Sequence, residues 1–259
     1  MTVGPLIRQW RVQRRMSQAA LSDAAEVSTR HLSCLETGKA HPSQQMVLLL
    51  ASALDIPLRE RNTLLRSAGY APAYAETDLF ADSGTAVRHA VELIVQSAPF
   101  GAIAVDRLWT IIVQDTAYDA FRRSLLPRPM EVGDNLLERT FAADGLRPYI
   151  ENWEEVARTT LERVRREALA DSDDALWALY ERLLAMDGVP VGWRQPASFL
   201  ADRLVVPIIL RAAGQRASLF STLTTVGTPV DVTLSEIRIE SYYPADAQTE
   251  ALLRAVRGA

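Results

Sequence analysis

Residues 17–39 read SQAALSDAAEVSTRHLSCLETGK. The stretch splits into two short helical segments, roughly 18–25 and 29–37, because apolar residues recur at helical spacing on both sides of a brief polar break. Ser17 and Ser28 stand directly before the two segments, where a hydroxyl can accept from a first-turn backbone N–H. The pattern predicts two short helices that meet at a tight turn and share a core, to which Leu21, Leu32 and Leu35 would contribute.

Three more helical segments surround this pair, at roughly 5–15, 43–54 and 57–68. Ser43 can cap the fourth segment in the same way. The punctuation between segments is spaced too closely for strands and crossovers. Residues 1–72 are therefore predicted to form a compact, mainly α bundle with a core of Trp10, Leu21, Val27, Leu32, Leu35, Val47, Leu50, Leu54 and Leu64.

This bundle resembles the Cro/repressor-type helix-turn-helix domain of the XRE superfamily. The resemblance is carried by the first-helix stretch 10–16, the SQxxL start at Ser17, the Val-Ser turn and the LExGK end at Lys39. One position departs from the pattern, since the turn residue that is usually Gly is Glu26. If that residue needs a positive φ, the side chain adds strain of about 1 kcal/mol.

The resemblance implies that the third helix enters the major groove of double-stranded DNA with its first residues over base edges. Carried over by position, Thr29, Arg30 and Ser33 would read bases, with Cys34 on the same face. Arg30 matters most, because a guanidinium can bond two acceptors of guanine and discriminate by about 1–3 kcal/mol. Cys34 is predicted to be a passive thiol, since it has no resolving partner.

Other positions of the motif imply phosphate contacts, which fix the position of the domain on the duplex, and an ion pair within the domain. Gln18, Ser28 and Lys39 match phosphate-gripping positions. Arg11 and Glu36 match an internal ion pair between the first and third helices. His31 is interpreted as a surface or phosphate-proximal residue, and no metal site is predicted because no second ligand stands at suitable spacing.

Charge is distributed unevenly along the chain. The total is -4, yet residues 1–72 hold nine basic side chains against five acidic ones, which gives +4 and leaves -8 for the remainder. This asymmetry suits one domain that meets phosphates and one that does not. No apolar run approaches the length of about 18 residues that a membrane helix needs. The chain has a single cysteine and so cannot form an intramolecular disulfide, and the sequence therefore favours a cytoplasmic protein without membrane contact.

A second domain is predicted after a break rich in Pro, Gly and small residues. The predicted domains are 1–72, a linker 73–84, and 85–259. The last begins with a helix at 85–97, continues into two short strands and several helices, and ends in a three-stranded meander. The expected strands are 102–105, 109–113, 204–212, 215–226 and 232–243, and the expected later helices are 115–125, one from Asn135, 152–170 and 174–186.

This order of elements resembles the PAS-like ligand-binding domain of the MmyB-like transcription regulators. The most specific stretches are 220–246 and 152–157. The resemblance implies an α+β fold with a five-stranded antiparallel sheet around an apolar cavity. It also implies a fatty-acyl or similarly lipophilic small-molecule effector.

Apolar side chains with a few polar anchors are what a ligand pocket requires. Arg211 or Arg203 could pair with a carboxylate head group, with a surface role as the favoured alternative for both. The apolar candidates share a large side chain in the predicted sheet or its flanking segments, and each has ordinary core packing as its alternative. They are Phe100, Ile103, Val105, Trp109, Ile111, Tyr118, Trp193 and Phe199.

The sequence therefore predicts a homodimeric, sequence-specific DNA-binding regulator that responds to a lipophilic molecule. The alternative is a regulator whose C-terminal domain binds a partner protein or only dimerises. An enzyme is not expected, because no G-x-S-x-G, P-loop or metal-ligand spacing occurs, and neither a catalytic residue nor a cofactor is predicted.

Overall fold

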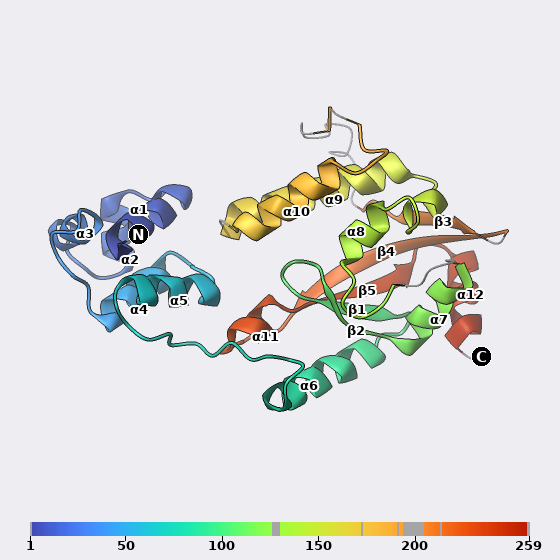
Figure 1. The fold of residues 1–259 in the computed structure, drawn as a ribbon, viewed down its shortest axis with the longest axis horizontal. Coiled ribbons are helices and arrows are strands. Elements are labelled where there is room, and N and C mark those ends of the chain that lie inside the picture. The colour runs from blue at the N-terminus through green and yellow to red at the C-terminus, as the bar shows by residue number, and fades with distance from the viewer. Residues whose placement is uncertain are drawn as a thin grey trace. The chain divides into compact units, whose positions relative to one another are not determined.

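The computed structural model of the chain describes residues 2–125, 130–171, 173–190, 192–193, 205–212 and 214–257. These residues divide into two compact units (Figure 1). The N-terminal unit comprises Met1–Thr77 together with Thr228–Ser235, and the C-terminal unit comprises Asp78–Gly227 together with Glu236–Ala259. The division at Thr77 falls inside the predicted linker, whereas residues 228–235 had been assigned to the C-terminal domain.

The N-terminal unit is built on five helices, and the mainly α bundle is confirmed. Ile7 and Trp10 of the first helix and Leu21, Leu32 and Leu50 of the later ones are buried in one shared core. The helices are α1 (Val3–Gln13), α2 (Gln18–Ala24), α3 (Thr29–Glu36), α4 (Gln44–Ala53) and α5 (Leu58–Ser67).

The three predicted serine caps are confirmed. The hydroxyl of Ser17 accepts from the N–H of Ala20, that of Ser28 from His31, and that of Ser43 from Met46, at 3.0, 3.2 and 3.2 Å. Each bond satisfies a donor that has no partner within its helix. The starts of α2, α3 and α4 are therefore fixed locally.

The C-terminal unit contains the predicted five-stranded antiparallel sheet. Its strand order is β2-β1-β5-β4-β3, so the last three strands form a meander and β5 returns to lie beside β1. The strands are β1 (Ala102–Val105), β2 (Ile111–Gln114), β3 (Ile208–Ala212), β4 (Gln215–Thr225) and β5 (Arg238–Pro244).

Helices cover both faces of this sheet (Figure 1). α6 packs on β1 and β2 through Val91 and Val95, while α8, α9 and α10 lie on the opposite face, and α12 packs on β4 and β5. The helices are α6 (Thr85–Gln96), α7 (Thr116–Leu125), α8 (Leu136–Phe141), α9 (Trp153–Asp171), α10 (Asp174–Leu184) and α12 (Ala247–Arg257), while α11 (Val232–Glu236) follows β4 in the chain and falls mostly within the residues grouped with the N-terminal unit.

One predicted strand is partly wrong. Residues 232–236, expected at the start of the last strand, form the helix α11. Asp231 caps this helix, because its Oδ1 accepts from the N–H of Leu234 at 3.0 Å and its carbonyl accepts from Ser235 at 3.0 Å. A side-chain cap of this kind competes with strand pairing and ends the extended run.

The first hairpin also differs from the prediction, because the second strand begins at Ile111 and not at residue 109. Trp109 has a φ of 67°, in the left-handed region. The carboxylate of Asp106 holds the turn by accepting from the N–H of Leu108 and of Thr110, both at 2.8 Å. This turn chemistry extends the connection beyond the two residues that were expected.

Candidate nucleic-acid interface and buried cavity

The first turn of α3 is the most exposed part of the helix-turn-helix. Thr29, Arg30 and His31 are exposed together with the cap Ser28, whereas Leu32 and Leu35 are buried beneath them. The helix is thus anchored by its inner face while its leading side chains face outward. This presents a positive helix end and a guanidinium on one surface.

Glu26, in the turn before α3, adopts the positive φ considered for this position from the sequence. Glu26 has a φ of 53°, and the N–H of Val27 donates to the carbonyl of Ser22 at 2.9 Å. A non-glycine residue in this region carries about 1 kcal/mol of strain. The turn geometry is kept in spite of Glu26, so α3 starts where the motif requires.

A buried ion pair links α1 to α3. The Nε and Nη2 atoms of Arg11 donate to the two carboxylate oxygens of Glu36 at 2.6 and 2.9 Å, and Nη1 donates to the carbonyl of Met16 at 2.9 Å. The predicted pair of Arg11 and Glu36 is therefore present. Burial alone would raise the pKa of Glu36, but hydrogen bonds from Arg11 and Gln18 outweigh it and leave that pKa below its ordinary value.

The side chains predicted to contact DNA differ in their exposure and in whether they already bond to other residues of the chain. The amide of Gln18, predicted to grip phosphate, donates to Glu36 at 2.8 Å, so its side chain is part of the internal network. Ser33 and Cys34 are half-buried, and Lys39 is exposed after the end of α3. Among the residues that the structure describes, Arg30 and Lys39 form no ion pair and remain available to an anion.

A small, partly open cavity of about 50 Å³ lies in the C-terminal unit, between α8, α9 and strands β3 to β5. Most of its wall is aliphatic, and the polar part consists of Thr140, Thr160, Arg163, Glu240 and Tyr242. Space of this size admits a few water molecules. The apolar lining residues are Met130, Leu136, Leu137, Leu146, Val156, Ile208, Leu210 and Leu219.

The acidic wall of the cavity is held in place by hydroxyl groups. Glu240 is only 4% exposed, and its two carboxylate oxygens accept from Ser221 at 2.6 Å and from the Tyr242 hydroxyl at 3.1 Å. Thr140 donates to the carbonyl of Leu136 at 2.7 Å. The cavity therefore combines apolar walls with a fixed carboxylate.

The basic wall is different, because Arg163 is incompletely paired. Its Nε is buried and has no hydrogen-bond partner among the described residues, and its guanidinium lies 4.2 Å from the centre of the Trp109 ring. The neighbouring acid Glu167 is already engaged, since it accepts from Arg238 at 2.6 Å and from the Trp109 indole at 3.2 Å. An unpaired buried donor beside a cavity is suited to an acceptor that enters it.

The residues predicted to contact a ligand lie elsewhere in the unit. Ile103, Val105, Trp109 and Ile111 are buried in the same core, but among the predicted ligand residues whose side chains the structure describes, none lines the cavity. Trp193 is 8% exposed with the guanidinium of Arg158 over its ring. These side chains therefore act as packing in this structure, and their role in ligand binding stays a prediction.

The remaining predicted ligand residues are placed as follows. Phe100 packs edge-on against Tyr243, at 6.4 Å between ring centres. Arg211 is largely exposed and donates to Glu151 at 2.6 Å, which matches its alternative as a surface residue. Tyr118 belongs to α7, and Phe199 and Arg203 lie outside the described residues.

None of the cavity residues was predicted to bind a ligand, because the apolar stripes of the helices between Asn135 and Asp187 are equally typical of ordinary packing surfaces. One signal was available in β5, where Glu240 and Tyr242 alternate with Ile239 and place a carboxylate on an inward position. A buried acid in a strand is rare unless it is paired or functional. That pattern could have directed attention to this face of the sheet.

The described part of the chain has neither a cluster of metal-ligating side chains nor a helix suited to span a membrane. Within it, no three His, Cys, Asp or Glu side chains are grouped closely enough to hold a metal ion. None of its helices combines the length and the apolar character needed to cross a membrane.

Comparison with known proteins gives two family matches. Residues 87–256 match the family described as the MmyB-like transcription regulator ligand binding domain, and residues 7–61 match the family described as Helix-turn-helix. No curated protein matches the chain. Among solved structures, one described as an RNA-binding Light-Oxygen-Voltage Receptor is 14% identical, with a TM-score of 0.31.

That last likeness is too weak to support an inference. It covers 95% of this chain, and the chain spans 59% of that structure's length. The ligand-binding-domain match, in contrast, extends over more than half of the present sequence and follows the helix-turn-helix match in order. The chain therefore belongs to the MmyB-like transcription regulators, with a helix-turn-helix domain ahead of the ligand-binding domain.

Proposed function

We propose that this protein is a sequence-specific DNA-binding regulator that inserts the first turn of α3 into the major groove. The observation that carries the proposal is the exposed, serine-capped start of α3, where Arg30 has no ion pair with any residue that the structure describes. Arg30 reads bases with Thr29 and Ser33, while Ser28 and Lys39 hold phosphates. Because its amide is bonded to Glu36, Gln18 contributes through its backbone N–H at the start of α2.

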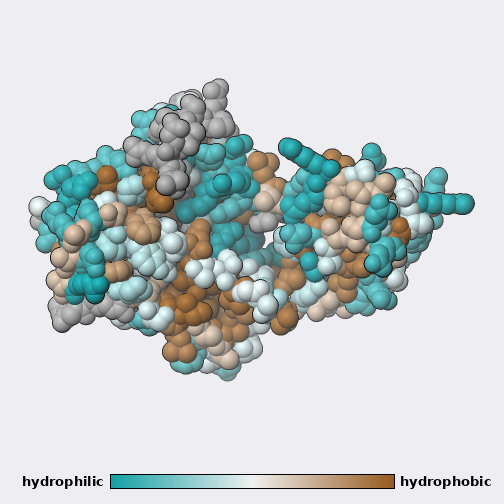
Figure 2. Space-filling model, turned by 180° about the vertical axis from the view of Figure 1, so that it is seen from behind, coloured by the Kyte–Doolittle hydropathy of each residue, from teal (hydrophilic) through white to brown (hydrophobic). Residues whose placement is uncertain are grey.

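The regulator acts as a homodimer, which places two recognition helices on a roughly palindromic site. Support comes from the outer face of α6, where Leu93 and Ile94 are 59% and 45% exposed. Figure 2 shows apolar side chains gathered over the region of α6, at the bottom of the view. Arg88 and Glu92 lie one turn apart on α6 and form an ion pair at 3.6 Å within the chain, and in two antiparallel copies of α6 each could exchange this partner for the opposite charge of the other copy.

The DNA proposal is tested by replacing one residue of each kind. With an operator selected from a random duplex pool, Arg30→Ala should lower operator affinity by about 10-fold or more and relax the base preference, since a bidentate pair is worth about 1–3 kcal/mol. Lys39→Ala should weaken all duplexes about equally and reduce the salt slope by about one. Gel shifts across salt concentrations measure both effects.

The matched control is Arg66→Ala, an exposed arginine of α5 away from α3. It should leave operator affinity unchanged. An Arg30→Ala variant that still binds the operator like the wild type removes Arg30 as the main base reader. The mass of the complex in the same titration tests the homodimer, because a single chain per palindromic duplex contradicts it.

The effector is a lipophilic molecule with an anionic head, such as a fatty acid. Its head pairs with Arg163, whose buried Nε has no hydrogen-bond partner in the described part of the chain, and its chain lies against the aliphatic wall. A cavity of about 50 Å³ is too small for a long chain, so binding requires α9 to part from β3, β4 and β5. Ligand entry is then coupled to a movement of the sheet.

The alternative function is a C-terminal domain that binds a partner protein or only dimerises, without a small-molecule effector. The exposed apolar face of α6 is consistent with this alternative as well as with the homodimer of the main proposal. Native mass spectrometry of the purified chain separates the two, because a copurifying lipid supports the effector and its repeated absence supports the interaction domain.

Arg163→Gln tests the effector's head group with sodium dodecanoate and dodecanol as probes. Loss of a charge-assisted hydrogen bond should weaken dodecanoate binding by roughly 10-fold to 100-fold and leave dodecanol binding unchanged, as measured by calorimetry. Arg166→Gln, an exposed arginine on the same helix, is the control. Equal loss of both probes in Arg163→Gln would indicate a packing role for Arg163 and contradict the anchor.

A further inference from the structure

The segment between β4 and β5 contains residues whose contacts belong to the N-terminal unit. We call Thr228–Glu236 the β4–β5 clip; its residues 228–235 are grouped with the N-terminal unit, although they lie between two strands of the C-terminal sheet. The N–H of Val232 donates to the carbonyl of Ala75 at 2.8 Å, as part of an isolated parallel bridge between residues 75 and 231.

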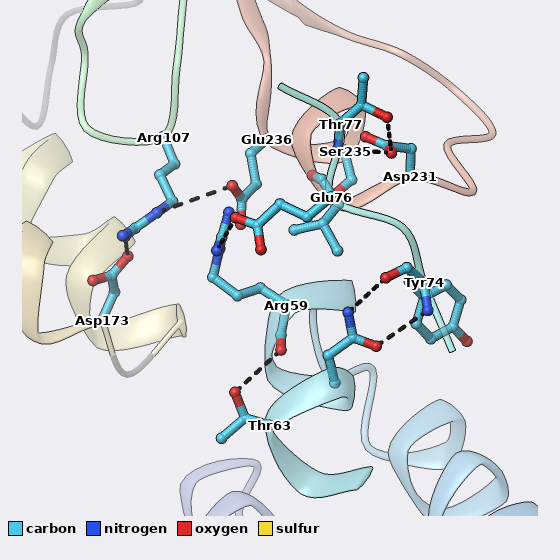
Figure 3. Close-up of polar contacts among 12 residues, drawn as sticks. Arg59, Thr63, Tyr74, Glu76, Thr77, Arg107, Asp173, Asp231, Ser235 and Glu236 are labelled. Carbon is cyan, nitrogen blue, oxygen red and sulfur yellow. Dashed lines mark hydrogen bonds and ion pairs between the residues drawn. The ribbon is translucent and has the colours of Figure 1, made fainter. Parts of the chain in front are cut away.

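Asp231 is the central residue of the clip. Its Oδ2 accepts from the Thr77 hydroxyl at 2.7 Å and from the Thr77 N–H at 3.2 Å, while its Oδ1 caps α11 through Leu234 (Figure 3). One carboxylate therefore joins the linker to the start of α11. Charge-assisted bonds of this kind are shorter and stronger than neutral ones.

The linker is in turn bound to α5. Asn62 is 4% exposed; its Oδ1 accepts from the N–H groups of Ala73 and Tyr74 at 3.0 and 3.1 Å, and its Nδ2 donates to the carbonyl of Tyr74 at 2.8 Å. Arg59, one turn earlier on α5, forms an ion pair with Glu76 at 2.5 Å (Figure 3). The stretch 73–77 is thus held by α5 and by the clip at once.

The last residue of the clip is held within the C-terminal unit. Glu236 lies 4.0 Å from Arg107, in the turn between β1 and β2, and Arg107 also pairs with Asp173, the cap of α10 (Figure 3). The strands that the clip connects carry the cavity residues Leu219 and Tyr242. A displacement of β4 or β5 must therefore be taken up by the clip, because the chain is continuous through both.

We propose that the β4–β5 clip transmits the state of the cavity to α5 through Asp231, Thr77 and the stretch 73–77. This proposal rests on the proposed function in one respect, since it names how occupation of the cavity reaches the DNA-binding unit. When the cavity expands, β4 and β5 move the clip, the bridge to Ala75 shifts, and the hold of Asn62 and Arg59 on the linker is altered. In this proposal the linker residues 73–77 have two arrangements, one for each state of the cavity. Contacts with the clip and with α5 determine which of the two is favoured.

The test uses the full chain and no effector, so that failure of the effector proposal remains distinguishable. Leu219→Trp overfills the cavity from β4 and mimics its expansion, while Leu223→Trp, at a 40% exposed position of the same strand, is the matched control. Hydrogen exchange is measured at residues 73–77, at 58–67 and in the strands. We expect about 10-fold faster exchange at Ala73, Tyr74 and Thr77 in Leu219→Trp and wild-type rates in the control.

The same measurement in the Asp231→Ala and Thr77→Val backgrounds tests whether the effect reaches residues 73–77 through Asp231 and Thr77. In these backgrounds Leu219→Trp should still perturb β4 and β5 but should add nothing at 73–77. Perturbed strands with unchanged exchange at 73–77 in the wild-type background overturn the proposal, as does a response at 73–77 that persists in both backgrounds. Val156→Phe, on the α9 wall of the cavity, repeats the test if Leu219→Trp does not fold.

Discussion

Glu36→Ala should lower the free energy of unfolding of the N-terminal unit by about 3–5 kcal/mol, because it leaves Arg11 as a buried charge without its partner. The side chains of Arg11 and Glu36 are 11% and 2% exposed, and Gln18 loses its acceptor in the same variant. Urea denaturation followed by circular dichroism measures the change. The matched control is Glu250→Ala, which breaks the exposed pair with Arg254 and should cost less than about 1 kcal/mol.

The same carboxylate predicts how stability depends on pH. The pKa of Glu36 is lower in the folded chain than its ordinary value of 4.5, so its contribution is fully present above about 4.5 and is lost as pH falls through the folded-state pKa. Glu36→Gln should therefore flatten the stability profile in this acidic range. A wild-type profile as flat as that of Glu36→Gln, or a Glu36→Ala cost no larger than the Glu250→Ala cost, contradicts the role assigned to the pair.

The helix-turn-helix could be predicted from the sequence because its determinants are local. Ser17, Ser28 and Ser43 each accept from a backbone N–H three residues later, and this spacing is visible in the printed chain. Even the positive φ of Glu26 was considered from the position of this residue in the motif. The five-stranded sheet was likewise predicted from alternation and turn residues, although Asp231 converted the start of its last strand into α11.

The cavity could not be predicted in the same way, because its walls come from segments far apart in the chain. Leu136 of α8, Val156 of α9 and Leu219 of β4 meet only after the fold has formed. Each appears in the sequence as one more apolar residue of an amphipathic element. The partner of Arg211 also depends on the fold, since Glu151 precedes it by sixty residues, so a surface ion pair could be misread as a ligand anchor.

Trp109→Ala is expected to lower the free energy of unfolding by about 3–5 kcal/mol, the range for removing a large aromatic from a core. The ring is fully buried, has the guanidinium groups of Arg163 and Arg238 at 4.2 and 5.5 Å from its centre, and donates its indole N–H to Glu167. Its removal leaves a void in the core and removes the contacts of the ring with the two arginines and with Glu167. Thermal and urea denaturation of the full chain measure the loss.

Trp109→Phe separates this structural role from ligand binding. Phenylalanine keeps a ring beside Arg163 but cannot donate to Glu167, so we expect a loss of about 1–2 kcal/mol and unchanged dodecanoate affinity. Since Trp109 does not line the cavity, its effect on an effector passes through the position of Arg163 alone. A Trp109→Phe variant that keeps its stability yet loses dodecanoate would instead place the ring in contact with the ligand, as the sequence first predicted, and would mean that the occupied cavity extends toward the β1–β2 turn.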